Sequence, residues 1–359
     1  MAEIDIMEFL KQERKRIDAI IERWIPRKVS EEYLEFLLGK AKWRYSLEAF
    51  QHAILDPIWE FLDRGGKRWR PVLFLLVNEA LGGDPRKVED FCIIPELIHE
   101  GTIIVDDIED KGELRRGKPC LHLIFGEDIA INVGNFLYFL PLVVFREKRD
   151  LFPPSVYLKA YETYIQEMIN VSVGQGTDIY WHQGKASEIS EEEYLQMCAN
   201  KTGCLARMAA KLAAIFAGAS DEVVEKVGSV AEALGVAFQI QDDILDVTLK
   251  GEKREIFGKA FGNDIKEGKR SLMVIYTLQH ATENDRRRLL EILDKHTDDV
   301  EEKLEAIAIL EKYGAIEYAK RRARELVSQA WSKAEPLLRE GEAKEKLRAF
   351  AEFLITREF

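Results

Sequence analysis

The chain has 359 residues and a formal net charge of −12, with 47% hydrophobic and 32% charged residues. A chain of this length and composition can bury a large core, and its interspersed charges indicate solvated helix faces rather than disorder. The acidic balance argues against nucleic-acid binding, because affinity for that polyanion comes mainly from Lys and Arg on phosphates. We therefore expect no nucleic-acid partner, although local basic clusters can still hold small anions.

The first half of the chain predicts helices throughout. Residues 1–55 form an amphipathic helical preface, and residues 56–150 contain long apolar helices interrupted by prolines. A turn is predicted at residues 149–155, where two prolines follow each other. We find no alternating apolar and polar run typical of a strand, and no Asn-Gly or Asp-Gly signal of a hairpin.

The second half continues the helical pattern. Ser190 with Glu193 predicts a capping box at a helix start, and residues 220–248 are strongly helical. Residues 249–269 are rich in Gly and Lys, which predicts an active-site flap. Charged amphipathic helices follow, and no low-complexity linker divides the chain. We therefore predict one all-α domain over residues 1–359, a helical bundle.

Cysteine usage and the N-terminus indicate a cytoplasmic protein. The four cysteines form no CxxC pair and lie in or beside apolar stretches, as expected of reduced core residues. The N-terminal sequence lacks the basic-then-apolar order of a secretory signal. The most apolar run, FLYFLPLVVF, is too short to cross a bilayer, so no transmembrane segment is expected.

Two copies of the pattern DDxxD follow apolar helical runs, one at Asp106, Asp107 and Asp110 and the other at Asp242, Asp243 and Asp246. In a helix, the first and last acids of each box share one face. Hard oxygen ligands on one turn suit Mg²⁺, whose coordination substrate phosphates can complete. A single box is most often a solvated helix end, but two converging boxes would repel without cations between them. We therefore predict a divalent metal site rather than general acid–base catalysis.

Basic residues accompany both boxes. The segment GGKRWRP contributes Lys67, Arg68 and Arg70, and further candidates are Arg115, Arg116, Lys201, Thr202 and Lys259. Each alone is most often a surface residue, and His99 alone would most often be a core histidine. Together with two acidic boxes, they match a polyphosphate, whose oxygens bind both metal and Arg or Lys. Tyr180 and Trp181 are interpreted as packing residues.

These motifs resemble the trans-isoprenyl diphosphate synthases, or polyprenyl synthetases. GGKRWRP, the first DDxxD with its trailing RRGKP, GQGTDIYW, KTG and QIQDDILD occur in the family's order, over roughly residues 60–280. DDIED, NFLYFL and GQGTDIYW look most like geranylgeranyl diphosphate synthases. The resemblance implies a homodimer of helical bundles, each with a deep central cavity. It also implies that an allylic diphosphate is condensed with isopentenyl diphosphate.

The resemblance further implies a role for each matching residue. A Mg²⁺ cluster would bridge the allylic diphosphate and both boxes, ligated by Asp106, Asp110 and Asp242, supported by Asp243, Asp246 and Asp264, with Asp107 among the catalytic acids. The allylic diphosphate would be held by Arg115, Lys201 and Lys259. Isopentenyl diphosphate would be held by Lys67, Arg70, His99 and Arg116, and Lys269 counts among the substrate-binding residues. The developing cation would lie near Thr202 and Gln239.

Some residues depart from the family pattern, and other functions remain open. Val105 replaces a frequent His, Asn135 a frequent Asp, and Ser271-Leu-Met the usual Thr-Leu-Pro, which puts the subfamily rather than the activity in question. A terpene cyclase would need neither GGKRWRP nor a second box. A non-catalytic regulatory subunit of a heteromeric synthase would be expected to lose acids from one box. A longer-chain polyprenyl synthase remains the main alternative.

Product length is expected to depend on small residues one turn before the first box. Thr102 and Gly101 precede Asp106 by four and five positions, and one helical turn rises about 5.4 Å, close to one isoprene unit. Aromatic residues at these positions would close the pocket early, whereas Gly101 and Thr102 are small and leave it open. We therefore argue against farnesyl diphosphate as the final product. Ile98 is the next candidate floor, as are three aromatic residues on another helix, Phe136, Tyr138 and Phe139. We predict geranylgeranyl diphosphate, and Gly101→Phe should shorten it.

Overall fold

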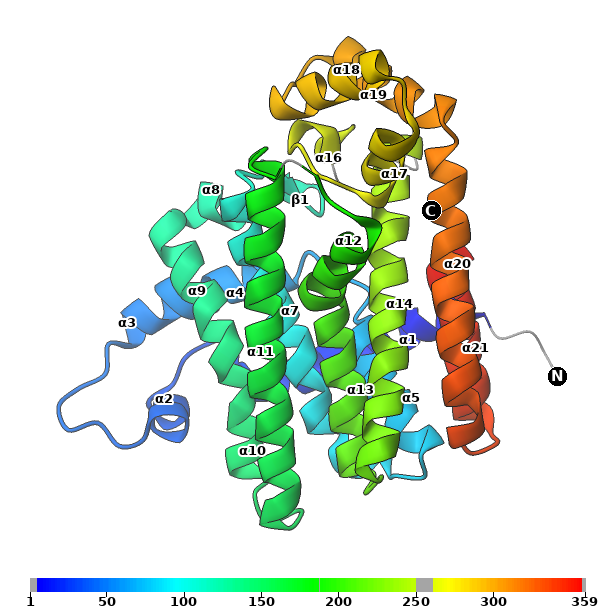
Figure 1. Ribbon diagram of the computed structural model, residues 1–359. Helices are drawn as coiled ribbons and strands as arrows, with labels where there is room; N and C mark the ends of the chain where they lie inside the picture. The colour runs from blue at the N-terminus through cyan, green and yellow to red at the C-terminus, as the bar shows by residue number, and fades with distance from the viewer. Residues whose placement is uncertain (1–4, 187, 250–260, 357–359) are drawn as a thin grey trace. The chain divides into compact units, whose positions relative to one another are not determined.

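The computed structural model describes residues 5–186, 188–249 and 261–356, and helices form nearly all of the regular structure (Figure 1). Within these ranges the only strands are β1 (Leu114–Arg115) and β2 (Lys118–Pro119), which pair antiparallel. The all-α prediction is therefore confirmed. Contacts divide the chain into two compact units, and the prediction of a single domain stays a prediction.

Unit 1 comprises Met1–Leu75 and Asp84–Tyr157. Its helices are α1 (Ile6–Trp24), α2 (Glu31–Leu38), α3 (Leu47–Phe50), η1 (Gln51–Leu55), α4 (Asp56–Leu62), α6 (Pro85–Val88), η2 (Glu89–Cys92), α7 (Ile93–Glu109), α8 (Leu121–Phe125), α9 (Glu127–Phe139), η3 (Leu140–Leu142) and α10 (Val143–Glu147). Helix α5 (Trp69–Ala80) begins in this unit, and so does α11 (Pro154–His182). Helix α7 packs against α9, and its buried face carries Ile94, Leu97, Ile98 and Ile104 at helical spacing.

Unit 2 comprises Leu76–Gly83 and Leu158–Phe359. It holds most of α11, followed by α12 (Glu191–Cys198), η4 (Ala199–Gly203), α13 (Cys204–Phe216), α14 (Asp221–Thr248), α16 (Asn263–Lys266), α17 (Leu272–His280), α18 (Glu283–Asp294), α19 (Val300–Lys312), α20 (Ala315–Ala334), η5 (Glu335–Leu337) and α21 (Glu342–Thr356). Helix α14 packs against both α13 and α20 (Figure 1). The predicted capping box of Ser190 and Glu193 is present at the start of α12.

The cysteines and the apolar stretch of α9 bear on two further predictions. All four cysteines are buried free thiols, as predicted for core residues. Within the described residues, one helical stretch, Glu127–Glu147, is long and apolar enough to cross a membrane by length and composition. It is longer than the ten-residue run considered above, but a partly buried core helix meets the same test. The absence of a transmembrane segment therefore stays a prediction.

Candidate active site

The first acidic box ends α7, in unit 1. Asp107 is buried, and its Oδ1 accepts hydrogen bonds from Arg115 Nε at 2.8 Å and from Arg115 Nη2 at 2.5 Å. Asp106 is less buried, with its Oδ2 3.7 Å from the same Nη2. Burial raises the pKa of Asp107, and Arg115 opposes that rise. Asp107 is therefore committed to Arg115, while Asp106 and Asp110 lie one helical turn apart.

A β-hairpin with a two-residue turn between β1 and β2 sets the directions of Arg115 and Arg116. Arg116 and Gly117 join β1 to β2 with φ values of 54° and 75°. Such turns suit the twist of paired strands, because both central residues have positive φ. This hairpin has no Asn-Gly or Asp-Gly signal in the sequence, because its turn residues are Arg-Gly. Arg115 meets the first box, whereas Arg116 donates to Gly65 O at 2.5 Å and to Glu100 Oε1 at 2.9 Å.

The three cations of GGKRWRP have different surroundings. Lys67 is half-buried and lies just before α5. Arg68 is only 2% exposed and is bound by acids of its own unit. Arg70 is buried too, and its guanidinium lies over the Trp69 ring, 4.3 Å from the centroid. The binding roles expected of Lys67 and Arg70 stay predictions, while Arg68 has a separate role within the protein.

His99 lies on α7 about two turns before the first box. Loss of solvation lowers its pKa well below 6.5, and the positive charges of Arg70 and Arg116 lower it further. The imidazole is therefore neutral at pH 7. It can offer an anion one N–H donor but no charge.

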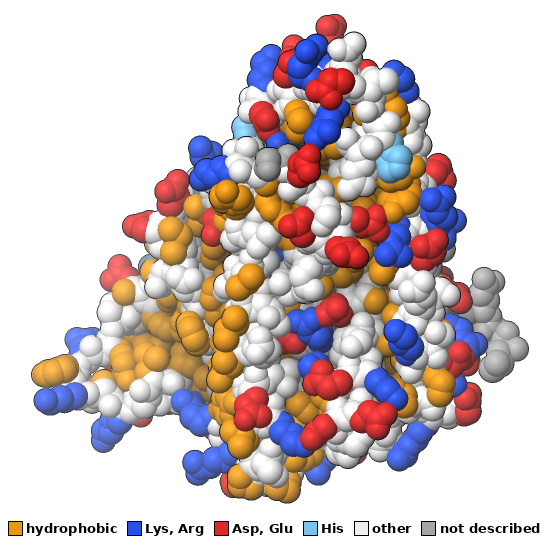
Figure 2. Space-filling view, in the orientation of Figure 1, with side chains coloured by type: hydrophobic (Ala, Val, Ile, Leu, Met, Phe, Trp, Pro, Cys, Tyr) orange, Lys and Arg blue, Asp and Glu red, His pale blue; other side chains and the backbone are white. Residues whose placement is uncertain are grey.

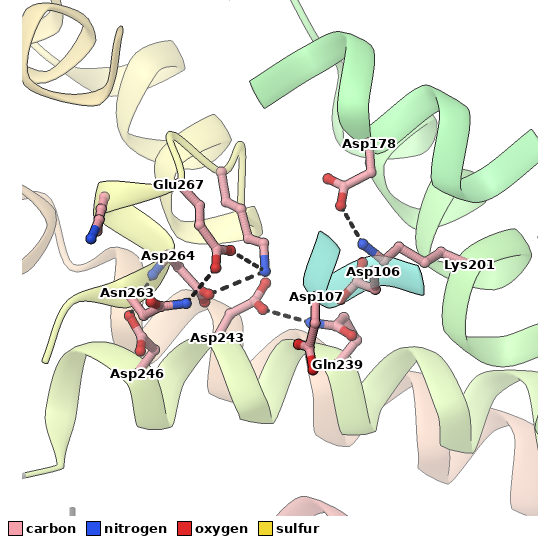
Figure 3. Close-up of polar contacts among 12 residues, drawn as sticks. Asp106, Asp107, Asp178, Lys201, Gln239, Asp243, Asp246, Asn263, Asp264 and Glu267 are labelled. Carbon is pink, nitrogen blue, oxygen red and sulfur yellow. Dashed lines mark hydrogen bonds and ion pairs between the residues drawn. The ribbon is translucent and has the colours of Figure 1, made fainter. Parts of the chain in front are cut away.

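The second acidic box lies on α14, in unit 2. Asp243 is buried and accepts a hydrogen bond from the Tyr194 hydroxyl at 3.1 Å. It accepts another from Gln239 Nε2 at 2.8 Å (Figure 3). Gln239 Oε1 accepts a hydrogen bond from Thr202 Oγ1 at 3.0 Å. Burial raises the pKa of Asp243 to about 7. Both oxygens of Asp243 are thus engaged within unit 2, whereas the neighbouring Asp242 is half-buried.

The segment after residue 260 contacts the end of the second box. Asp246 is fully buried, and its Oδ2 accepts a hydrogen bond from Asp264 N at 3.1 Å. Lys269 Nζ lies 2.7 Å from Glu267 Oε2 and 3.4 Å from Asp264 Oδ1. Lys269 is therefore placed beside carboxylates. Lys259 lies outside the described residues, as do residues 250–260 of the predicted flap.

Lys201 and Thr202 lie on the π-helical turn η4. Such turns are rare and often occur at functional sites. Lys201 Nζ lies 2.6 Å from Asp178 Oδ2, and the two side chains point toward each other in Figure 3. Asp178 was not predicted as a site residue, although it lies in the GQGTDIYW motif. It is the single acidic residue of that motif, and this could have indicated a partner for a lysine. In the same motif, Trp181 is buried as predicted, but Tyr180 is 51% exposed and does not pack in the core.

Gly174 explains how α11 reaches η4. A β-carbon on Gly174 would lie 2.3 Å from Lys201 N and 2.6 Å from Asn200 C, both backbone atoms of unit 2. Only a residue without a side chain permits this approach. The GQG portion of the motif therefore has a structural reason, because it seats the Lys201 turn against α11.

The predicted chain-length residues on α7 have three different surroundings. A β-carbon on Gly101 would lie 2.7 Å from Gly134 O on α9. Gly101 thus serves close helix packing, which counts against the idea that its small size opens a pocket. Thr102 is half-buried and donates a hydrogen bond to a carbonyl one turn earlier, and Ile98 is fully buried. Their roles in product length stay predictions, but Gly101→Phe would separate two helices and is a poor test of pocket depth.

The three aromatic candidates on α9 also differ. Phe136 packs edge-on against Phe50, with ring centroids 6.2 Å apart, and Tyr138 is half-buried. Phe139 is 65% exposed in this chain. An exposed ring cannot close the end of a buried pocket within one chain, so Phe136 and Tyr138 are the better candidates.

The carboxylates are suited to Mg²⁺ by their chemistry. Within the described ranges, no three acidic, imidazole or thiol groups are gathered closely enough to hold a metal ion. Asp106 and Asp110 nevertheless offer hard oxygens one turn apart, as Mg²⁺ requires. Asp107 Oδ2 is buried with no hydrogen-bond partner, which leaves an acceptor beside them. The donor set of the first box therefore fits a magnesium ion.

Comparison with known proteins agrees with these features. A family model described as Polyprenyl synthetase matches residues 51–310. The short chain isoprenyl diphosphate synthase of Methanothermobacter thermautotrophicus is 38% identical over 299 residues, covering 83% of this chain and 88% of that protein. The geranylgeranyl diphosphate synthase of Methanosarcina mazei is 33% identical, with the same coverage of both.

Solved structures share the fold over nearly the whole chain. A geranylgeranyl pyrophosphate synthetase from Pyrococcus horikoshii is 31% identical, with a TM-score of 0.83 over 99% of both chains. A decaprenyl diphosphate synthase from Rhodobacter capsulatus has a TM-score of 0.79 at 23% identity, covering 98% of this chain and 100% of that one. Synthases named for different products therefore share this helical bundle. The chain belongs to the polyprenyl synthetase family and is a trans-prenyltransferase.

Proposed function

We propose that the protein condenses isopentenyl diphosphate head-to-tail with an allylic diphosphate, and that its main product is geranylgeranyl diphosphate. The observation that carries the proposal is the combination of two intact acidic boxes with basic residues held in fixed positions by carboxylates, as in Arg115 with Asp107 and Lys201 with Asp178. Relatives named geranylgeranyl diphosphate synthase support the product. A longer product remains the alternative, because the fold is shared with a decaprenyl diphosphate synthase.

Asp106 and Asp110 in the first box and Asp242 in the second are the proposed Mg²⁺ ligands. Asp243 and Asp246 would act in support, since both already accept hydrogen bonds inside unit 2. When bound, Mg²⁺ would neutralise diphosphate oxygens and make the diphosphate a better leaving group.

The chain's own cations complete the proposed chemistry. Arg115 and Lys201 would bind the allylic diphosphate, whose negative charge grows as its C–O bond breaks. The Thr202 hydroxyl and the Gln239 amide would place oxygen dipoles near the allylic cation. The isopentenyl double bond then attacks this cation, forming the new C–C bond. The proton lost in this step passes to the departing diphosphate, because no side chain in the described site is an evident base.

Incubation of the purified protein with isopentenyl diphosphate and each allylic primer tests the proposal. Dimethylallyl, geranyl and farnesyl diphosphates would be compared, with Mg²⁺ and with EDTA, and products identified by mass spectrometry. Geranylgeranyl diphosphate formed only with Mg²⁺ is the expected result. Asp106→Ala and Asp242→Ala should each lower turnover by orders of magnitude while circular dichroism stays unchanged. No condensation with any primer would overturn the proposal.

We also propose that the protein is a homodimer that covers an apolar face of α11. Leu158, Ile165, Ile169 and Val173 are each more than half exposed and recur at helical spacing (Figure 2). A contiguous exposed apolar stripe typically marks a protein–protein contact. Light scattering should give twice the chain mass for the wild type and less for the doubly substituted Ile165→Lys, Ile169→Lys protein. An unchanged mass would exclude this face.

A further inference from the structure

Glu100 is a buried carboxylate that binds two arginines from different segments of unit 1. Its side chain is fully buried on α7. Its Oε1 accepts a hydrogen bond from Arg68 Nη1 at 2.6 Å and another from Arg116 Nη2 at 2.9 Å. Arg68 belongs to the GGKRWRP segment, and Arg116 to the turn of the β1–β2 hairpin. Glu100 therefore links the two segments that carry the residues expected to bind isopentenyl diphosphate.

Arg68 directs its guanidinium into the protein. Besides Glu100, its acceptors are Asp18 Oδ1 at 2.9 Å, Glu96 Oε1 at 3.1 Å and Leu62 O at 3.0 Å. Its backbone has a φ of 49°, in the left-handed region that non-glycine residues rarely adopt. With every guanidinium nitrogen bonded internally, Arg68 cannot also reach a substrate. Arg68 therefore fixes the end of the loop that precedes α5.

Arg116 receives its orientation from the same carboxylate. Its Nη1 donates to Gly65 O at 2.5 Å, and Gly65 begins the GGKRWRP segment. The Arg116 side chain is about one-fifth exposed. Arginine carries five N–H donors, and contacts to Glu100 and Gly65 leave others for a ligand. The two contacts therefore fix the orientation of the Arg116 guanidinium and leave some of its N–H donors for a ligand.

The negative charge of Glu100 offsets the positive charges of Arg68 and Arg116. Burial alone would raise the pKa of Glu100, but Arg116 and Arg68 outweigh burial and lower it. Glu100 is therefore ionised and offsets two guanidinium groups that would otherwise repel each other in a poorly solvated region. Glu96, one turn earlier on α7, is equally buried, but of these two arginines it contacts Arg68. Both glutamates are thus buried and contact Arg68, but Glu100 also contacts Arg116.

We propose that Glu100 is a positioning residue for the second substrate: it fixes Arg116 against the GGKRWRP segment so that both can hold the diphosphate of isopentenyl diphosphate. This inference rests on the proposed function and deepens it. Glu100 itself touches no substrate, because its side chain is fully buried between its arginine partners.

Two isosteric substitutions separate positioning from general stability. Glu100→Gln and Glu96→Gln each replace one buried carboxyl group that contacts Arg68, and both should lower the melting temperature. Only Glu100→Gln releases Arg116, so it should raise the KM for isopentenyl diphosphate by about 10- to 100-fold, the scale of a 1 Å misplacement. Its KM for the allylic substrate should stay within about twofold. Glu96→Gln should leave both KM values within about threefold.

A third variant covers the risk that Glu100→Gln fails to fold. Glu100→Asp keeps the charge but is one methylene shorter, so it cannot reach both arginines, and it should show the same selective rise in KM. Equal effects of the Glu100 and Glu96 variants, or equal rises in both KM values, would overturn the inference.

Binding of inorganic pyrophosphate, measured by calorimetry on the full-length protein, distinguishes this inference from the proposed function. Weaker binding to Glu100→Gln than to the wild type supports positioning even if the wild type forms no product, a result that would overturn the proposed function alone. Equal binding to the two proteins overturns positioning alone. No binding to the wild type overturns both.

Discussion

Replacing Gly174 by Ala tests whether close contact between α11 and η4 holds Lys201 in place. The new β-carbon would lie 2.3 Å from Lys201 N, whereas ordinary contacts begin near 3.4 Å. The clashing atoms are backbone, so no side-chain rotation can relieve the overlap. The helix and the turn must therefore separate by about 1 Å, which moves Lys201 away from Asp178.

Two opposing terms set the effect of Gly174→Ala on stability. Ala is favoured over Gly in a helix by about 1 kcal/mol, which would stabilise α11. Forcing an extra methyl group into a packed contact costs about 1–3 kcal/mol, and this overlap is severe. The net change should be a destabilisation of about 1–2 kcal/mol. A 1 Å displacement of Lys201 should also lower kcat/KM for the allylic substrate by about 100-fold.

Gly228→Ala in α14 is the matched control. Its β-carbon would also be crowded, with Lys211 Cε at 2.7 Å and Cγ at 2.9 Å, but these atoms belong to a flexible side chain. The control should therefore change the melting temperature little and leave kinetics intact. Thermal melts and steady-state kinetics on both variants would decide the matter. Equal melting temperatures, or normal kcat/KM in Gly174→Ala, would refute the argument from close packing.

Three further outcomes are expected. Gly101→Ala should lower the melting temperature through its clash with α9 without shortening the product, and a shorter product at normal stability would restore the pocket interpretation. Asp178→Asn should raise the KM for the allylic substrate by about tenfold and spare that for isopentenyl diphosphate, since it frees Lys201; equal effects on both would contradict this. Burial lowers the pKa of His99 well below 6.5, so the unfolded chain binds a proton that the folded chain refuses. The free energy of unfolding should therefore fall below pH 6.5, by up to about 1.4 kcal/mol per pH unit, and a titration of His99→Gln showing the same slope would exclude His99 as the cause.

The fold class and the acidic boxes could be predicted because their signals are local. Helical periodicity predicted α14 to within one residue at its start, and the spacing of Asp106 and Asp110 placed them one turn apart. Such inferences need only the geometry of a single helix. The capping box at Ser190 is local in the same sense, since its two partners are three residues apart.

Partners distant in sequence could not be predicted in this way. Arg68 looked like one more cation of a phosphate-binding cluster, but it meets Asp18 and Glu100, which are 50 and 32 residues away. Gly101 looked like the open wall of a pocket, but the position that it faces on α9 depends on how two helices cross. The direction of a side chain around its helix follows from the sequence, whereas the neighbour it meets depends on tertiary packing.

Three of the predicted substrate-binding cations are each paired with a carboxylate, which the number of Lys and Arg residues in the motifs does not reveal. Arg115 pairs with Asp107, Arg116 with Glu100 and Lys201 with Asp178, each within its own unit. These carboxylates fix long side chains that would otherwise lose conformational freedom on binding a ligand. They also cancel positive charge, which weakens attraction for a free diphosphate in a poorly solvated site. The arrangement therefore favours orientation over net charge. In the proposed mechanism, a divalent ion held by the acidic boxes would meet the remaining negative charge of a bound diphosphate.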